Sequence, residues 1–120
     1  MTVKYSTKET DPLGLKPDDP GAKLDAGKLM AGVLFDFSHA LTEVSRVGTF
    51  GAKKYSRGGW QSVKDGETRY FDAMVRHLLA MNTDCDIDAD SGCLHLAQVA
   101  WNALATSEFQ SHAEAEHQSQ

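Results

Sequence analysis

Two sets of polar residues with helical spacing lie between positions 69 and 102. In each set the residues stand at i, i+3 and i+7, so three polar side chains share one face of a helix. Two arginines on one face can bind phosphate oxygens, each with two parallel hydrogen bonds. The two sets together predict a polar cleft between two helices. They are Arg69, Asp72 and Arg76 in the first helix and His95, Gln98 and Asn102 in the second.

The two arginines also allow a purely structural interpretation. Arg69 and Arg76 could form ion pairs inside a helix bundle, with Asp72 and Glu43 as partners. Buried arginines are commonly held by such pairs, because an unpaired buried charge is unfavourable. The sequence leaves both interpretations open.

A second group of cations and aromatic residues lies at the end of a predicted helix and in the glycine-containing loop that follows. Ammonium and guanidinium groups next to aromatic rings suit a phosphate together with a base. A loop tryptophan can equally cover the core. Lys28, which follows Gly27, could reach an anion or lie in a solvated turn. The group consists of Lys53, Lys54, Tyr55, Arg57 and Trp60.

Carboxylates and histidines gather around the connection between the two polar helices. Carboxylates with a few imidazoles suit Mg²⁺ or Mn²⁺ better than zinc, which prefers more nitrogen and sulfur. The loop D-C-D-I-D-A-D-S-G is no EF-hand, because Ala89 and His95 stand where that loop requires glycine and glutamate. Its aspartates could simply cap helices in a solvated turn. The metal candidates are Asp72, His77, Asp86, Asp88, Asp90 and His95.

Three helices are predicted to position these residues. Apolar residues recur at helical spacing and β-branched residues do not alternate, so the sequence predicts an all-α fold. Gly48 and Gly51 would allow close approach of another helix or a ligand. Residues 1–28 are predicted to form an irregular arm, 29–109 a nucleotide-binding domain that begins with an extended segment or short helix, and 110–120 a frayed or disordered tail. The predicted helices are His39–Tyr55 with Ser38 as N-cap, Glu67–Met81 with Asp65 as N-cap, and Ser91–Phe109 with Asp90 or Ser91 as N-cap.

The composition fits one domain, with 120 residues, 41% hydrophobic and 24% charged. A net charge of -5 argues against a nucleic-acid polymer as partner. No apolar run is long enough to span a membrane, and two cysteines without a C-x-x-C pair fit a reduced, cytoplasmic setting. Three helices cannot cover aromatic residues such as Phe50, Phe71 and Phe109, so we expect a homo-oligomer with the ligand cleft near the subunit contact.

The order of several motifs resembles one known family, although no P-loop, H-E-x-x-H or G-x-S-x-G motif is present. The motifs are D-A-G-K, E-V-S-R-V-G-T-F-G-A-K-K-Y, G-W, R-Y-F-D-A-M-V-R-H-L, D-x-D-S-G-x-L-H-L-A and W-N-A-L. In this order they resemble the phage family of dATP/dGTP diphosphohydrolase N-terminal domains, over about Asp25 to Leu104. The resemblance implies an all-α, phage-encoded protein of the host cytoplasm, akin to the MazG-like nucleotide pyrophosphohydrolases. Those enzymes hold Mg²⁺ with E-E-x-x-E and E-x-x-D patterns, whereas this chain has one glutamate around Glu43 and no E-x-x-D in its last helix.

The resemblance and the residues leave two functions open. The first is metal-dependent hydrolysis of a purine (deoxy)nucleoside triphosphate to monophosphate and pyrophosphate, with Mg²⁺ or Mn²⁺. The second is a binding module that sequesters a nucleotide signal of host defence without turnover or metal. In the enzyme, Glu43, Asp72 and His77 would be catalytic, and Glu43, Asp72, Asp90 and His95 would hold the metal. In either case the ligand-binding residues would be Lys28, Lys53, Lys54, Tyr55, Trp60, Arg69, Arg76 and Asn102.

Overall fold

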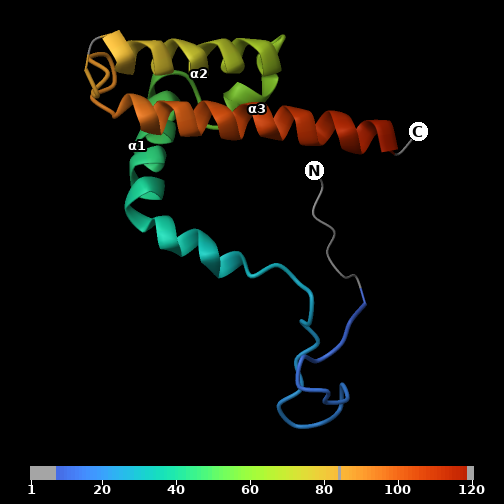
Figure 1. Ribbon diagram of the computed structural model, residues 1–120. Helices are drawn as coiled ribbons and strands as arrows, with labels where there is room; N and C mark the ends of the chain where they lie inside the picture. Colours follow the sequence, from blue (N-terminus) through green and yellow to red (C-terminus); the bar gives the residue numbers. More distant parts are fainter. Residues whose placement is uncertain (1–7, 84, 119–120) are drawn as a thin grey trace. The chain divides into compact units, whose positions relative to one another are not determined.

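The structure is a computed structural model that describes residues 8–83 and 85–118. The chain divides into two units, Met1–Asp36 and Phe37–Gln120. The described residues contain no strand, apart from one isolated bridge between Ile87 and Leu94, so the predicted all-α fold is confirmed. The ends of the predicted arm and tail, residues 1–7 and 119–120, lie outside the described residues. The elements are η1 (Ala31–Phe37), α1 (Ser38–Lys54), η2 (Gly59–Ser62), α2 (Gly66–Thr83) and α3 (His95–Gln118), as Figure 1 shows.

Helices α2 and α3 run side by side in opposite directions and form most of the second unit (Figure 1). The ring centroid of Tyr70 lies 5.8 Å from that of Trp101 and 6.2 Å from that of Phe109. Two turns further along α2, His77 contacts His95 in the first turn of α3. The contacts therefore advance in opposite directions along the two helices, as expected for helices joined by a short loop.

Helix α1 packs against the beginning of α3 through a small apolar cluster. Val47 is buried against Ala97, and Trp101 covers them from the side. Gly48 permits this approach, because a Cβ at that position would lie 3.1 Å from the Nε1 of Trp101. Close approach of a second helix at Gly48 is thus confirmed. At Gly51 no described atom lies within 4 Å of the Cβ position, so that glycine serves no such contact.

The predicted N-cap of the first helix was wrong. Ser38 is the first residue of α1, and the cap position belongs to Phe37, which makes no side-chain capping hydrogen bond. Helix α2 begins at Gly66, directly after Asp65. The carbonyl of Asp65 accepts the first helical hydrogen bond, from the N–H of Arg69 over 3.0 Å, so Asp65 stands at the predicted cap position. Its φ of 57° differs from the extended backbone that is usual for a cap.

The predicted bounds of the third helix were also wrong. It begins at His95 and not at Ser91, because the residues before it form a closed loop. Within this loop the N–H of Asp88 donates to the carbonyl of Cys93 over 2.8 Å. The aspartates and the serine were expected to begin the helix, but they belong to this loop instead. At its other end α3 continues to Gln118, well past the predicted end.

The described part of the first unit is irregular up to η1, yet its backbone is hydrogen-bonded around one buried carboxylate. Asp11 accepts the N–H of Leu13 over 2.6 Å and that of Lys23 over 2.7 Å. The N–H of Ala26 donates to the carbonyl of Thr10 over 2.9 Å, which closes the loop. Asp11 therefore joins two segments of the chain, since its bonded partner Lys23 lies 12 positions away.

We expect acidification to loosen this loop locally. The hydrogen bond from the Lys23 N–H, aided by those from Leu13 and Leu15, lowers the pKa of Asp11 below its ordinary value, although burial opposes the shift. A carboxyl with a lowered folded-state pKa stabilises the fold above its unfolded pKa, and the effect is lost as the pH falls through the folded value. The amide of Lys23 should therefore shift in NMR spectra below about pH 4. In Asp11→Ala, the Lys23 amide signal should already have its low-pH position at neutral pH. A Lys23 amide signal that does not change with pH in the parent protein would contradict this role of Asp11.

Candidate functional site

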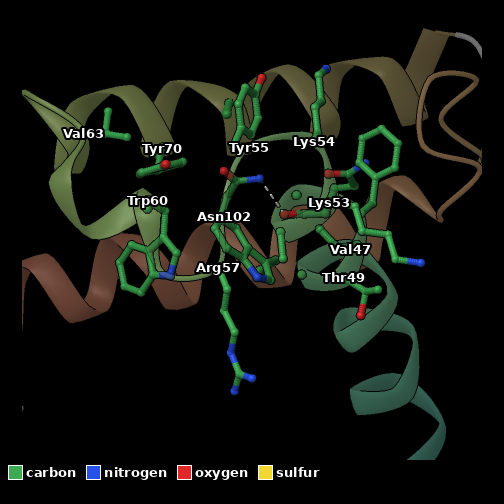
Figure 2. A pocket seen from close by; sticks show the side chains of 18 of the residues that line it. Val47, Thr49, Lys53, Lys54, Tyr55, Arg57, Trp60, Val63, Tyr70 and Asn102 are labelled. Atoms are coloured by element: carbon green, nitrogen blue, oxygen red, sulfur yellow. Dashed lines mark hydrogen bonds between the residues drawn. The ribbon is translucent and has the colours of Figure 1, made fainter.

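A cleft of about 1320 Å³ lies within the second unit. It is bordered by the end of α1, the segment 55–63 and the facing sides of α2 and α3, which Figure 2 shows from close by. Both predicted polar faces contribute to it, since Arg69, Asp72 and Arg76 line it from α2 and Gln98 and Asn102 from α3. Most predicted site residues lie in this cleft: Lys53, Lys54, Tyr55, Trp60, Arg69, Asp72, Arg76, His77, Asp90 and Asn102.

Three predicted site residues are not part of the lining. Glu43 lies earlier on α1, where its carboxylate accepts a contact from the Nε of Arg46 over 3.3 Å. His95 is buried behind the cleft with only 5% of its surface exposed. Lys28 belongs to the first unit and is exposed there.

The cations of the cleft are mostly available to a ligand. Among the residues that the structure describes, neither Arg69 nor Arg76 forms an ion pair. One guanidinium nitrogen of Arg69 donates to the carbonyl of Lys64 over 3.2 Å, which fixes the direction of its side chain. The alternative in which both arginines pair with Asp72 and Glu43 is therefore not what the structure shows.

Lys54 is held more firmly than the arginines. Its Nζ lies 3.4 Å from an oxygen of Asp90 and within 6 Å of the ring centroids of Phe50 and Tyr55. The hydrogen bond with Asp90 is the main cause of a raised pKa of Lys54. Both partners are substantially exposed, so a ligand phosphate can compete with Asp90 for this ammonium group.

Two histidines form a direct contact between α2 and α3. The Nδ1 atoms of His77 and His95 lie 2.9 Å apart, so one of them is the hydrogen-bond donor and the other the acceptor. Burial is the main cause of a lowered pKa of His77, and the charges of His95 and Arg76 act in the same direction against the opposing effect of Asp88. His77 is therefore neutral at neutral pH. The Nε2 of His77 remains available to a ligand in the cleft, whereas the Nδ1 of His95 is already hydrogen-bonded to His77.

Asp88 organises the loop before α3. Its Oδ2 accepts the hydroxyl of Ser91 over 2.8 Å and the side-chain amide of Gln98 over 3.0 Å. Burial alone would raise the pKa of Asp88, but the hydrogen bonds from Ser91 and from the N–H of Asp90 outweigh it and lower the pKa. A serine three positions after an aspartate is typical of such a local turn. The sequence left open a metal ligand or a helix-capping turn for this aspartate, and the structure shows it folding the turn.

Four aromatic rings pack together beside the cleft, and three of them, Trp60, Tyr70 and Trp101, line it. Trp60 makes edge-on contacts with Trp101 and Phe109, with centroids 5.9 and 5.7 Å apart, and with Tyr70 at 6.4 Å. Trp60 and Tyr70 lie close together in Figure 2. Trp60 therefore covers the core and lines the cleft at the same time. Tyr70 was missed as a lining residue, although it shares a helical face with Ala73 and His77 at i, i+3 and i+7.

Gly66 is needed where α2 begins against this cluster. A Cβ at Gly66 would lie 2.4 Å from the Cζ of Phe109, closer than any real contact. We expect Gly66→Ala to lower the free energy of unfolding by on the order of 1 kcal/mol through overpacking, measured by urea unfolding. The double variant Gly66→Ala, Phe109→Leu should lose less unfolding free energy than the sum of the losses in the two single variants. Strict additivity would show that the ring of Phe109 moves away without resistance.

Comparison with known proteins agrees with the motif order. The family model described as dATP/dGTP diphosphohydrolase, N-terminal, matches residues 18–119. A dATP/dGTP diphosphohydrolase of Salmonella phage PMBT28 is 35% identical over 80 residues, which are 67% of this chain and 26% of that protein. The chain thus spans about a quarter of the length of this relative. No solved structure matches, and no helix in the described part of the chain is long and apolar enough to cross a membrane. With most of its length covered by the family model, the chain belongs to the family of dATP/dGTP diphosphohydrolase N-terminal domains.

Proposed function

We propose that the cleft binds a purine deoxynucleoside triphosphate and that the protein hydrolyses it to the monophosphate and pyrophosphate. The name of the phage relative supports the reaction. The observation that carries the proposal is the pair Arg69 and Arg76, two arginines without an ion-pair partner in the described structure, on one side of a cleft that also contains aromatic rings. Unpaired arginines on a shared face are the groups that proteins use to bind phosphates in a fixed geometry.

The ligand would lie in the cleft with its phosphates at the cations and its base at the aromatic rings. Arg69 and Arg76, with Lys53 and Lys54, would neutralise the phosphates. Tyr55 at the rim, which is 77% exposed, and Trp60 would contact the base. The amide nitrogen of Asn102 donates one hydrogen to the carbonyl of Gln98 over 2.8 Å, so its second N–H and its amide oxygen are left for hydrogen bonds with a base.

A divalent cation fits this proposal only as a companion of the triphosphate. Among the described residues, no group of three or more His, Cys, Asp or Glu side chains is placed to hold a metal ion. Mg²⁺ at phosphate sites is commonly bound by one or two carboxylates together with the substrate phosphates. Asp72 and Asp90 both line the cleft and would hold Mg²⁺ or Mn²⁺ in this way. The metal would supply positive charge at the phosphate oxygens.

His77 would take the role of a base in this proposal. Its lowered pKa keeps the imidazole neutral at neutral pH, which is the form that accepts a proton. The contact with His95 fixes the ring of His77 through its Nδ1, so His95 is a positioning residue here and not a metal ligand. Glu43 has no part in the proposal, since its carboxylate is bound to Arg46 outside the cleft lining.

One observation favours a second candidate, a module that retains a nucleotide without turnover. Asp90 is already paired with Lys54 and Asp88 already accepts side-chain hydrogen bonds, so Asp72 is the one predicted metal carboxylate of the cleft with neither kind of partner in the described structure. Cations and aromatic rings suffice for retention, whereas hydrolysis requires the carboxylates. A nucleotide signal of host defence would be the ligand of such a module.

A nucleotide panel separates the two functions. The protein is incubated with dATP, dGTP, ATP and GTP in the presence of Mg²⁺ or Mn²⁺, and both the products and the retained nucleotide are quantified by chromatography. We expect a deoxynucleoside monophosphate and pyrophosphate in equal amounts. Tight retention without product would refute hydrolysis and support the retaining module, and release of inorganic phosphate instead of pyrophosphate would refute the proposed bond cleavage.

Arg76→Ala is expected to weaken nucleotide binding without unfolding the protein. A hydrogen bond to a charged group contributes about 1.5–3 kcal/mol, so the Kd should rise roughly 10- to 100-fold. Arg46→Ala is the matched control, because Arg46 is exposed on α1, pairs with Glu43 and does not line the cleft. Calorimetric titration measures Kd, and thermal unfolding checks the fold. An Arg76→Ala protein that melts far below the parent while binding normally would make Arg76 a structural residue.

A further inference from the structure

The side of the α2–α3 pair that faces away from the cleft carries an apolar surface. We define this back face by Phe71, Val75 and Leu78 on α2 and by Leu96, Ala100 and Ala103 on α3. Phe71, Leu78 and Leu96 expose 49%, 42% and 59% of their surfaces, and Ala103 is exposed as well. Three large apolar side chains on one face are thus left in water by a single copy of the chain.

Helical geometry places all six residues opposite the cleft. Each residue turns an α-helix by about 100°, so the residues at i, i+4 and i+7 share one side. On α2 this side is turned by roughly 90–150° from Arg69, Asp72 and Arg76, which line the cleft. On α3 it is about half a turn away from Gln98, Trp101 and Asn102, which also line it. Because the two helices pack side by side, their back sides form one continuous surface.

The core of the second unit is too small to explain the apolar content of α3. The buried apolar residues of the described chain are Val47, Cys93, Ala97 and Ala105, and no large side chain is fully buried. Yet apolar residues occupy all sides of α3 between Leu96 and Ala105. A helix that is apolar all round is normally covered on all sides. Helices α1 and α2 cover two sides, and the back face remains without cover in the described structure.

The charge pattern indicates what covers it. The chain has a net charge of -5, so two copies repel each other wherever acidic surfaces meet. The back face contains no charged residue, although Glu67, four positions before Phe71, borders its end on α2. Such a surface is self-complementary, because identical uncharged patches can meet around a two-fold axis without like-charge contacts.

A stable dimer contact would need more surface than the six residues of the back face. A stable interface removes about 800 Å² from each partner. Helix α2 has 18 residues and is about 27 Å long, and two adjacent helices are about 20 Å wide, so the footprint of the whole pair is on the order of 500 Å² in projection. The accessible area of a surface covered with side chains exceeds its projection. The contact would therefore extend along the whole length of the α2–α3 pair, with the back face at its centre.

We propose that the back face is a homodimer interface, in which the α2–α3 pairs of two copies pack against each other around a two-fold axis as a four-helix bundle. Phe71, Leu78 and Leu96 lose their exposure to water in this contact, and small residues at 100 and 103 let the two α3 helices approach closely. Both clefts stay open on the outer sides of the dimer. The contact thus lies opposite the cleft, unlike the expectation from the sequence, which placed the cleft near the subunit contact.

Analytical ultracentrifugation at micromolar concentration tests this proposal. The parent should sediment with twice the chain mass of 13.1 kDa, and Leu96→Glu with the mass of one chain while its helical circular dichroism persists. Leu13→Glu is the matched control, since Leu13 is 85% exposed in the first unit, and it should remain dimeric. A monomeric parent overturns the proposal. So does a dimer that survives Leu96→Glu, in particular one that is instead dissociated by Leu34→Glu in the exposed segment η1.

A crosslinking experiment keeps the proposal testable if Leu96→Glu fails to fold. Cys85 is exposed and is first replaced by serine, whereas Cys93 is buried and unreactive. A flexible bismaleimide should then join two copies of the Cys85→Ser, Ala103→Cys protein. The control is Ala115→Cys in the same background, at an exposed position of α3 off the back face. Equal crosslinking of both variants, or none at position 103, overturns the proposal.

Discussion

Trp101→Ala is expected to lower the free energy of unfolding by about 3–5 kcal/mol. Trp101 joins the two apolar centres of the second unit. Its ring packs edge-on against Trp60 and Tyr70 with centroids 5.9 and 5.8 Å away. The other edge of the ring covers Val47 and approaches the backbone at Gly48. Removing the ring therefore opens a cavity between all three long helices at once.

Thermal unfolding and urea unfolding measure this effect. For a chain of this size the loss corresponds to a decrease in Tm of about 10–20 °C. Leu104→Ala is the matched control, because Leu104 lies three positions later on the same helix and is 56% exposed. It should change stability by less than about 1 kcal/mol. Equal losses in both variants would mean that Trp101 contributes no more than an ordinary surface residue and that the helices are held together elsewhere.

The features that depend on one helix were predictable from the sequence. The common face of Arg69, Asp72 and Arg76 follows from the periodicity of the helix alone, and all three line the cleft. Gly48 was recognised as a point of close approach because glycine is unfavourable inside a helix unless something else requires it. Local rules of this kind do not depend on how the helices are placed relative to one another.

The features that depend on two elements could not be predicted. The contact between His77 and His95 requires the register of α2 against α3, which the loop between them fixes. Glu43 lies on nearly the same side of α1 as Lys54, yet it is about 16 Å further back along the helix axis and so outside the cleft lining. The start of α3 was misplaced because two local structures compete for the same residues. Asp88 and Ser91 bond each other in a turn, so Ser91 does not cap the helix.

Asp72→Asn is expected to reduce hydrolysis of the preferred triphosphate by about 100-fold, which corresponds to about 3 kcal/mol of transition-state stabilisation. Asparagine keeps the size of the side chain and removes its charge. Asp72 is exposed and forms no ion pair in the described structure, so the change removes no contact that supports the fold. The loss would arise because Asp72 is one of two carboxylates proposed to hold Mg²⁺ at the triphosphate.

The controls for Asp72→Asn come from two other aspartates. Asp65 lies outside the cleft lining, directly before the same helix, and asparagine tolerates the left-handed backbone there. Asp65→Asn should therefore leave turnover unchanged. Hydrolysis is measured as pyrophosphate release with saturating Mn²⁺. If Asp72→Asn turns over as fast as the parent, Asp72 holds no metal in the reaction.

Asp90→Asn distinguishes the two roles that Asp90 could have. If Asp90 is a metal ligand, it is required for turnover. The turnover of Asp90→Asn should then decrease as that of Asp72→Asn does. If Asp90 serves only to hold Lys54 over 3.4 Å, then asparagine releases this ammonium group for the phosphates. In that case turnover stays near that of the parent, and metal-free nucleotide binding becomes tighter. Since Asp72→Asn frees no cation, tighter metal-free binding in Asp90→Asn but not in Asp72→Asn would assign Asp90 to the ion pair and leave Asp72 as the carboxylate on which hydrolysis depends.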